Sequence, residues 1–211
     1  MIKNIIFDLG VVLLDVNYQN TIDAFSVLGL DNPEEAFSKQ KQDEFFRKYE
    51  RGEISDDEFL IGLSERMGGV DLNKLRNAWC RMLGELPREK YNLIKKLNQD
   101  YRLFILSNTN QIHQLWFEKK IGEQYGWKSF SDCFEFIGYS HQINQRKPDK
   151  EAFQYVLKKH DLESKETLFV DDTMEHVEGS RKLGVHAIHY KEGEDLEELV
   201  LTEIKRVLTS F

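Results

Sequence analysis

Short runs of aliphatic residues recur along the chain, and most of them are followed by a segment with helical spacing. These runs are residues 5–7 with 11–14, 103–106, 167–170 and 185–189, and a weaker one is 134–139. Continuous aliphatic runs are typical of strands buried on both faces, as in a parallel sheet. The helical segments are residues 88–98, 110–120, 148–159 and 173–183. This alternation predicts an α/β fold, a Rossmann-like parallel sheet with helices on both faces.

Residues 15 to 86 interrupt this alternation, because their pattern is helical without a convincing strand. Ser55 and Glu58 fit a capping box at a helix start, and the aromatic residues 45, 46, 49 and 59 have the spacing of a helical core. An insertion of this length far exceeds the usual βα loop of about 2–6 residues. We therefore expect an α/β core domain formed by residues 1–14 and 87–211, and a helical domain formed by residues 15–86.

Composition excludes several classes of protein. The chain has 211 residues, a formal net charge of −8 and no basic block, which argues against a nucleic-acid partner. No apolar run approaches the ~20 residues that span a bilayer, so no membrane association is expected. The two cysteines, Cys80 and Cys133, are too few for a disulfide scaffold and lack metal-ligand spacing. We expect a soluble, cytoplasmic protein.

Polar residues follow the predicted strands at the points where the strands end. Asp8 follows the first strand, Ser107-Asn108-Thr109 the second, and Asp171-Asp172 a later one, while Lys147 precedes a predicted helix. Each of these alone is as well explained by a helix cap, a turn or a solvated loop. Ligands of open α/β sheets bind at the carboxyl ends of the strands, where these residues would converge. Three carboxylates at one edge need a cation, and their hard oxygen atoms suit Mg²⁺.

Four segments, in the expected order, resemble the motifs of the haloacid dehalogenase (HAD) superfamily, whose members are mostly Mg²⁺-dependent phosphatases. They are Asp8 in FDLGVV, Ser107 in LFILSNT, Lys147 in QRKPDKEAF and Asp171-Asp172 in FVDDTMEHVEGSRKLGV. The insertion stands where many members carry a helical cap domain, and FRKYERGEISDDEF resembles caps of the sugar-phosphatase-like branch. The resemblance covers nearly the whole chain. It implies a HAD-like core, an inserted cap, and a small phosphorylated metabolite, such as a sugar phosphate, as substrate.

The resemblance also implies a role for each motif residue. Asp8 would attack phosphorus and form an aspartyl-phosphate. Mg²⁺ would be held by Asp8, the backbone carbonyl of Gly10 and Asp172. Asp171 would not bind the metal directly but would act through a metal-bound water or towards Lys147. The remaining expected roles concern the substrate: Ser107 donates to a phosphoryl oxygen, Lys147 neutralises Asp8 and the phosphate, and Asn108 and Thr109 add polar contacts.

One position departs from the family pattern. Most phosphatases of the family carry a second aspartate two residues after the nucleophile, as general acid and base, and here that residue is Gly10. General acid–base catalysis is typically worth ~10²–10⁴-fold, so its absence keeps open the alternative of a binding or regulatory protein with a degenerate site. A separate alternative is a metal-independent 2-haloacid dehalogenase, in which Asp8 would attack carbon and which would have no use for the Asp171-Asp172 pair.

Overall fold

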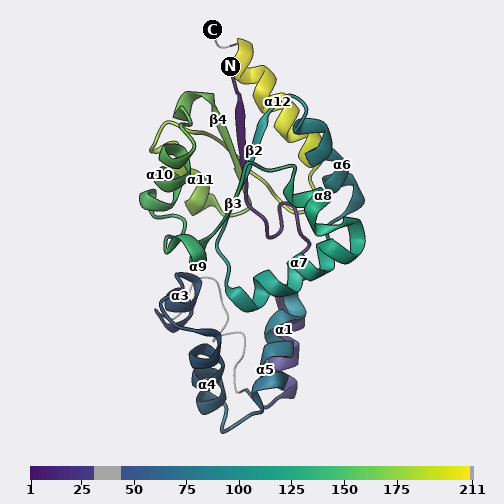
Figure 1. Ribbon diagram of the computed structural model, residues 1–211, viewed down its shortest axis with the longest axis vertical. Coiled ribbons are helices and arrows are strands. Elements are labelled where there is room, and N and C mark those ends of the chain that lie inside the picture. Colours follow the sequence, from purple (N-terminus) through teal and green to yellow (C-terminus); the bar gives the residue numbers. More distant parts are fainter. Residues whose placement is uncertain (31–43, 210–211) are drawn as a thin grey trace.

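A five-stranded parallel sheet forms the centre of the molecule, as the sequence predicts. The structure is a computed structural model that describes residues 1–30 and 44–209. The sheet has the order β3-β2-β1-β4-β5. Its strands are β1 (Asn4–Phe7), β2 (Arg102–Ser107), β3 (Phe136–Tyr139), β4 (Thr167–Asp171) and β5 (His186–His189). The central position of β1 places Asp8, the residue that follows it, between the ends of β2 and β4 (Figure 1).

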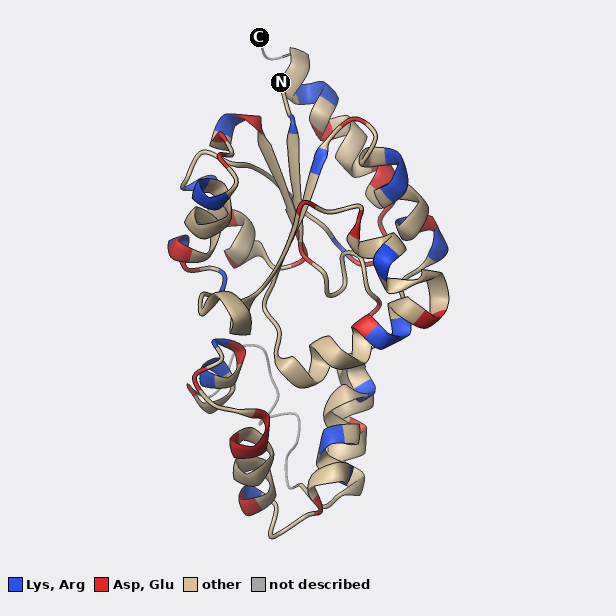
Figure 2. Cartoon of the chain, in the orientation of Figure 1, with Lys and Arg blue, Asp and Glu red and all other residues tan. Residues whose placement is uncertain are grey.

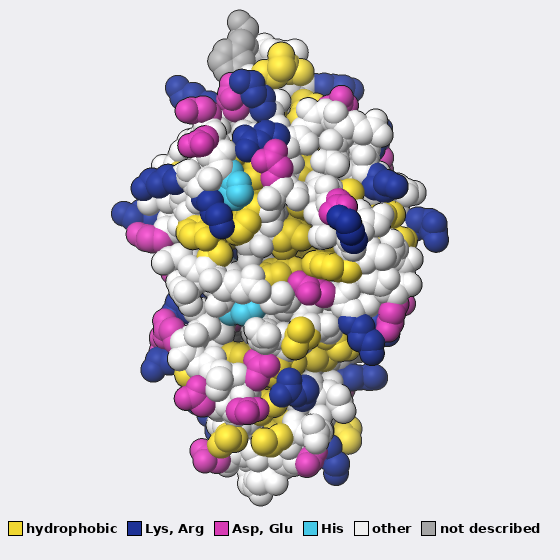
Figure 3. Space-filling model, viewed as in Figure 1, with side chains coloured by type: hydrophobic (Ala, Val, Ile, Leu, Met, Phe, Trp, Pro, Cys, Tyr) yellow, Lys and Arg dark blue, Asp and Glu magenta, His cyan; other side chains and the backbone are white. Residues whose placement is uncertain are grey.

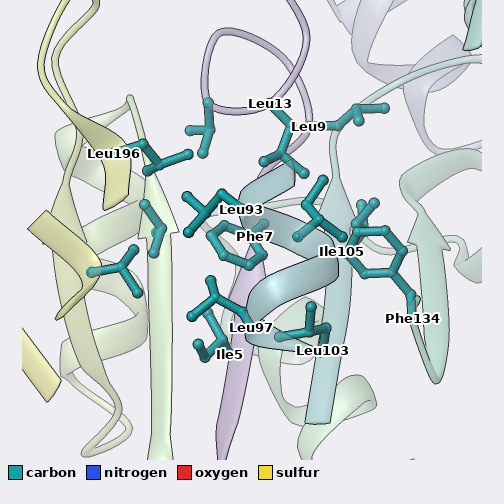
Figure 4. Close-up of a cluster of buried hydrophobic side chains, with 14 of the residues drawn as sticks. Ile5, Phe7, Leu9, Leu13, Leu93, Leu97, Leu103, Ile105, Phe134 and Leu196 are labelled. Atoms are coloured by element: carbon teal, nitrogen blue, oxygen red, sulfur yellow. The ribbon is translucent and has the colours of Figure 1, made fainter. Parts of the chain in front are cut away.

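Helices cover both faces of the sheet, and each face has its own apolar core. One core holds residues of α6 (Arg88–Leu97), α7 (Gln111–Tyr125), α8 (Trp127–Ser131) and α12 (Leu196–Thr209). The other holds residues of α10 (Lys150–Lys159) and α11 (Met174–Arg181). In Figure 4, Ile5 and Phe7 of β1 face Leu93 and Leu97 of α6. Burial of one such side chain stabilises a fold by ~1.5–3 kcal/mol.

Three short helices complete the described fold. The helix α9 (Ser140–Ile143) and the 3₁₀ helix η3 (Ser164–Glu166) belong to the α/β core, whereas the 3₁₀ helix η2 (Cys80–Met82) contributes to the apolar cluster of residues 15–86.

Most charged residues lie on the outside of the fold. In Figure 2 the strands are mostly tan, because charged residues lie mainly on helices and loops. On the face drawn in Figure 3, basic and acidic side chains are interspersed rather than gathered by sign. Within the described residues, the structure has no helix long and apolar enough to cross a bilayer.

The described part of residues 15–86 is helical and lies beneath the carboxyl ends of the strands (Figure 1). Its helices are α1 (Tyr18–Val27), α3 (Glu44–Glu50), α4 (Asp56–Arg66) and α5 (Leu72–Trp79). They share an apolar cluster that includes the predicted aromatics Phe46, Tyr49 and Phe59. The predicted capping box of Ser55 and Glu58 is confirmed at the start of α4. Residues 31–43 of the expected cap lie outside the described residues. We call the described helical part the cap, and its domain boundaries stay a prediction.

Candidate active site

Asp8, Lys147 and Asp171 form a buried chain of charged groups at the carboxyl edge of the sheet. The Lys147 Nζ atom donates to Asp8 Oδ1 at 2.8 Å and to Asp171 Oδ2 at 2.6 Å. The Lys147 side chain is 1 % exposed, and that of Asp171 is fully buried. An ammonium group is buried at this depth only if carboxylates compensate the loss of hydration. The structure therefore brings together three residues that stand far apart in the sequence.

The two carboxyl groups bonded to Lys147 have opposite pKa shifts. Burial raises the pKa of Asp8 to about 6, against the lowering effect of Lys147, and the nearby charge of Asp171 raises it further. Lys147 and the hydrogen bond from His176 lower the pKa of Asp171 to about 2, although burial opposes this shift. Asp171 is thus the permanent anion that balances Lys147, whereas Asp8 is a carboxylate that its surroundings stabilise poorly. A poorly stabilised carboxylate is suited to attack or to bind a metal.

Asp171 is also held by His176 of α11 and by Thr173, the residue before that helix, and neither contact was predicted from the sequence. His176 Nδ1 lies 3.0 Å from Asp171 Oδ1 and 3.1 Å from Oδ2, and the backbone N–H of Thr173 donates to Oδ1 at 2.7 Å. On β5, His189 Nε2 lies 3.0 Å from the carbonyl oxygen of Asp172. A histidine five residues after an aspartate carries no sequence signal of its own. These contacts follow from the turn between β4 and α11.

Asn108 holds the backbone of Lys147 through both ends of its amide. Its Nδ2 donates to the Lys147 carbonyl at 2.8 Å, and its Oδ1 accepts from the Lys147 N–H at 2.9 Å. The side chain that was predicted to contact substrate therefore fixes the segment that carries the lysine. A substrate contact of Asn108 through its backbone stays a prediction.

The other predicted residues lie at the same edge of the sheet. Ser107 is the last residue of β2 and is buried, and β2 pairs with β1 so that Ile105 lies opposite Phe7. Thr109 is buried and exchanges backbone hydrogen bonds with the Ser140 hydroxyl. The carbonyl of Gly10 accepts from the Val12 N–H at 2.7 Å, and its second lone pair leaves it able to bind a cation.

The carboxylates fit a small hard cation. Asp8, Asp171 and Asp172 each offer an oxygen, and these oxygens lie within 4.8 Å of one another. Asp171 is already engaged by Lys147, His176 and Thr173, which leaves Asp8 and Asp172 as the better placed ligands. Oxygen donors of this kind are those that Mg²⁺ prefers. The donor set therefore agrees with the predicted magnesium site.

The cap contacts the core beside this site. Glu50, the last residue of α3, forms an ion pair of 2.8 Å with Arg146, the residue before Lys147. The Arg146 side chain is 15 % exposed and the Glu50 side chain 16 %. Asn144 Nδ2 donates to the Arg51 carbonyl at 2.8 Å. Gly52 has a φ of +68°, and a Cβ there would lie 2.3 Å from the carbonyl oxygen of His141. Glycine is therefore required for this approach of cap and core.

These features define an α/β protein with a buried aspartate–lysine pair, an adjacent pair of acids and a helical cap over them. The family model of the haloacid dehalogenase-like hydrolases matches residues 5–190. The chain belongs to this family of hydrolases, which confirms the resemblance stated from its motifs.

Relatives extend over nearly the whole chain. The chain is 31 % identical over 196 residues to a D-ribitol-5-phosphate phosphatase of Bacteroides thetaiotaomicron, covering 92 % of this chain and 95 % of the relative. A HAD family enzyme from the same organism, crystallised as an aspartate-to-alanine variant with magnesium and inorganic phosphate, superposes with a TM-score of 0.88. The two chains are 32 % identical, and the match covers 95 % of this chain and 99 % of that one. A HAD-like hydrolase from Porphyromonas gingivalis gives a TM-score of 0.85 at 31 % identity, covering 99 % and 98 %.

Proposed function

We propose that the chain is a Mg²⁺-dependent phosphomonoesterase that acts on a small phosphorylated metabolite, with sugar phosphates as the first candidates. The observation that carries this proposal is the Lys147 ammonium, bonded at once to Asp8 and to the permanently charged Asp171. The name of the ribitol-phosphate relative and the magnesium and phosphate in the solved relative support the substrate class and the metal.

In the proposed reaction, an Asp8 carboxylate oxygen attacks phosphorus while the bond to the leaving oxygen breaks. An aspartyl-phosphate forms on Asp8, and the departing alkoxide takes a proton from water. A water molecule then attacks the phosphorus of this intermediate, which releases inorganic phosphate and restores Asp8. Lys147 offsets the negative charge on the phosphoryl oxygens, and Ser107 donates a hydrogen bond to one of them.

Mg²⁺, when bound, would supply positive charge that offsets the negative charge of the phosphoryl group. We assign Asp8, Asp172 and the Gly10 carbonyl as its protein ligands, with Asp171 outside them. Asp171 instead keeps Lys147 charged and in place, because its own contacts are with Lys147, His176 and Thr173. Asn108 positions Lys147 through its backbone.

The alternatives account for less of the site. A metal-independent dehalogenase would have no use for the acidic pair, and the match to a 2-haloacid dehalogenase from Pseudomonas syringae, at 17 % identity, shows the fold alone. A degenerate binding protein would not need the buried arrangement of Asp8 and Lys147, because an unused buried charge pair is often costly to keep.

A screen of phosphate release tests the proposal. The panel contains an aryl phosphate, anomeric and terminal sugar phosphates and ribitol 5-phosphate, each with Mg²⁺ and with a chelator. We expect release that needs Mg²⁺ and that the Asp8→Asn variant lacks. A chain that binds these phosphates without turnover would be a binding protein. Release of halide from 2-chloropropionate in the presence of a chelator would identify a dehalogenase.

A further inference from the structure

The turn that follows Asp8 contains a strained residue. Val11 has a φ of +64°, in the left-handed region that L residues with a branched Cβ rarely adopt. Its N–H donates to the Leu14 carbonyl at 2.8 Å, and the Leu14 N–H donates to the Leu9 carbonyl at 2.8 Å. A conformation of this kind persists only where its surroundings hold it in place.

Lys90 of α6 holds this residue from outside the turn. Its Nζ donates to the Val11 carbonyl at 2.9 Å. The Lys90 side chain is 12 % exposed, and its nearest carboxylate, that of Asp15, lies 4.0 Å away. Burial lowers the pKa of Lys90, which means that the ammonium sits there at a cost. The Val11 carbonyl lies closer to this ammonium than the Asp15 carboxylate or the Tyr190 ring, whose centroid is 5.4 Å from Nζ.

The turn also borders a cavity. Val11 and Lys90 both line a cavity of about 510 Å³, whose walls also include Asp15, Val16 and Tyr190. Val11 packs against the apolar core of this face of the sheet, and both it and Lys90 lie in the wall of the cavity. The hydrogen bond from Lys90 therefore adds a polar contact to the Val11 backbone at the edge of the cavity.

The conformation of Val11 bears directly on the site. Gly10 and Val11 share one peptide unit, so the torsion angles of Val11 set the direction of the Gly10 carbonyl relative to the rest of the turn. We propose that Lys90 is a positioning residue, which holds Val11 in its left-handed conformation and thereby aims the Gly10 carbonyl at the site of Asp8 and Asp172. The part of this inference that concerns the metal rests on the function proposed above.

The test compares Lys90→Met in two backgrounds, wild type and Val11→Gly, because glycine adopts a positive φ without steric strain. The first readout is amide exchange of residues 11–14 in the metal-free protein, and the second is Mg²⁺ affinity from calorimetry without substrate. Glu89→Gln is the matched control, since Glu89 lies on the same helix and lines the same cavity.

We expect Lys90→Met to speed exchange in the turn and to weaken Mg²⁺ binding by about tenfold or more, the usual size for a residue that orients a ligand. In the Val11→Gly background both effects should be clearly smaller, and Glu89→Gln should show neither. Equal effects in both backgrounds, or none in wild type, would overturn the inference. A Lys90→Gln variant, with a shorter side chain, replaces Lys90→Met if the latter does not fold. The exchange readout decides the role of Lys90 even if the protein binds no Mg²⁺ or hydrolyses no phosphate.

Discussion

At the residue scale, the site gives opposite pKa shifts to two residues of the same type, Asp8 and Asp171. Asp171 has three donors around it and stays charged, whereas Asp8 has a raised pKa because it is buried beside other carboxylates. The difference arises from the surroundings that the fold creates. The sequence motifs predicted which residues gather at this edge, but not that His176 and Thr173 would hold Asp171.

The raised pKa of Asp8 predicts a pH dependence of metal binding. Above about pH 6 the group is a carboxylate, and as the pH falls through about 6 it takes up a proton that a cation must displace. Mg²⁺ binding to the metal-free protein should therefore release a proton at about pH 6 but not at about pH 8, with lower affinity at the lower pH. Calorimetry in buffers of different ionisation enthalpy measures this release. The same proton release at both pH values would contradict the raised pKa of Asp8.

The two acids of the Asp171-Asp172 pair should differ in their effect on metal binding. Asp172→Asn removes a proposed ligand, and we expect it to weaken Mg²⁺ binding by at least about tenfold. Asp171→Asn should change Mg²⁺ affinity much less but lower kcat strongly, because Lys147 then loses a buried carboxylate partner at 2.6 Å. Calorimetry and steady-state kinetics of both variants check this. The reverse order of Mg²⁺ affinities would exchange the two roles.

Gly10 predicts a strong dependence of rate on the leaving group. Without an acid at this position, kcat/KM should fall steeply as the leaving group becomes more basic. A Cβ at Gly10 would meet Val16 Cγ2 at 3.5 Å, an ordinary contact distance, so Gly10→Asp should fit and should make the dependence shallower. A series of phosphate monoesters of graded leaving-group basicity measures both slopes. A shallow wild-type slope, or efficient hydrolysis of ribitol 5-phosphate, would mean that another group delivers the proton.

At the scale of elements, the cap meets the core through two different kinds of contact. On one side, Trp79 of the cap stacks on His113 of α7 with ring centroids 4.7 Å apart, and Ile112 of α7 belongs to the apolar cluster of the cap. On the other side, the contacts include the Glu50–Arg146 ion pair and the bond from Asn144 to Arg51. Apolar contacts of this kind resist separation in water, whereas hydration compensates separated charges. We therefore expect the polar side to open first.

Hydrogen exchange tests this order of opening. Arg146→Met should speed exchange of residues 50–53 by about fivefold, which corresponds to an ion pair worth about 1 kcal/mol, and should leave α5 unchanged. Arg206→Met, which breaks an exposed ion pair on α12, is the control. A bound phosphate mimic should slow exchange at residues 50–53. Faster exchange in α5, or no response to a mimic that is shown to bind, would contradict a cap that opens on its polar side.

The lengths of several elements differ from the sequence predictions. The helix predicted to end at Lys120 continues to Tyr125, where Phe117 and Ile121 lie buried against the sheet. The helix predicted from Pro148 begins at Lys150, and the strand predicted from Phe134 begins at Phe136. Helix α12 was not predicted, although its buried residues Leu196, Val200, Ile204 and Val207 have helical spacing. The aliphatic run at residues 11–14 forms a turn after β1 instead of a strand. The other aliphatic runs identify strands, whereas tertiary packing decides where the elements end.

At the scale of the whole molecule, the chain termini lie at the end of the sheet opposite to the cap, and the site lies between sheet and cap (Figure 1). This arrangement follows from one insertion after the first strand, because the chain leaves the core to form the cap and returns to the core beside Asp8. Asp15 and Glu85 pair through their backbones, as do Asp15 and Gly84, where the two connections run side by side. A cap in this place limits which substrates reach Asp8, and we infer from it a preference for small metabolites over phosphoproteins.

The central claim is that Asp8 attacks phosphorus, and covalent trapping at Asp8 tests it most directly. The wild-type protein is mixed with Mg²⁺ and an aryl phosphate, quenched in acid within the first turnover and digested for mass spectrometry. We predict a phosphoryl group on the peptide that contains Asp8, none on the same peptide of Asp8→Asn, and none in wild type with a chelator. Phosphate release without any phosphorylated Asp8, or a phosphoryl group on another residue, would contradict the mechanism.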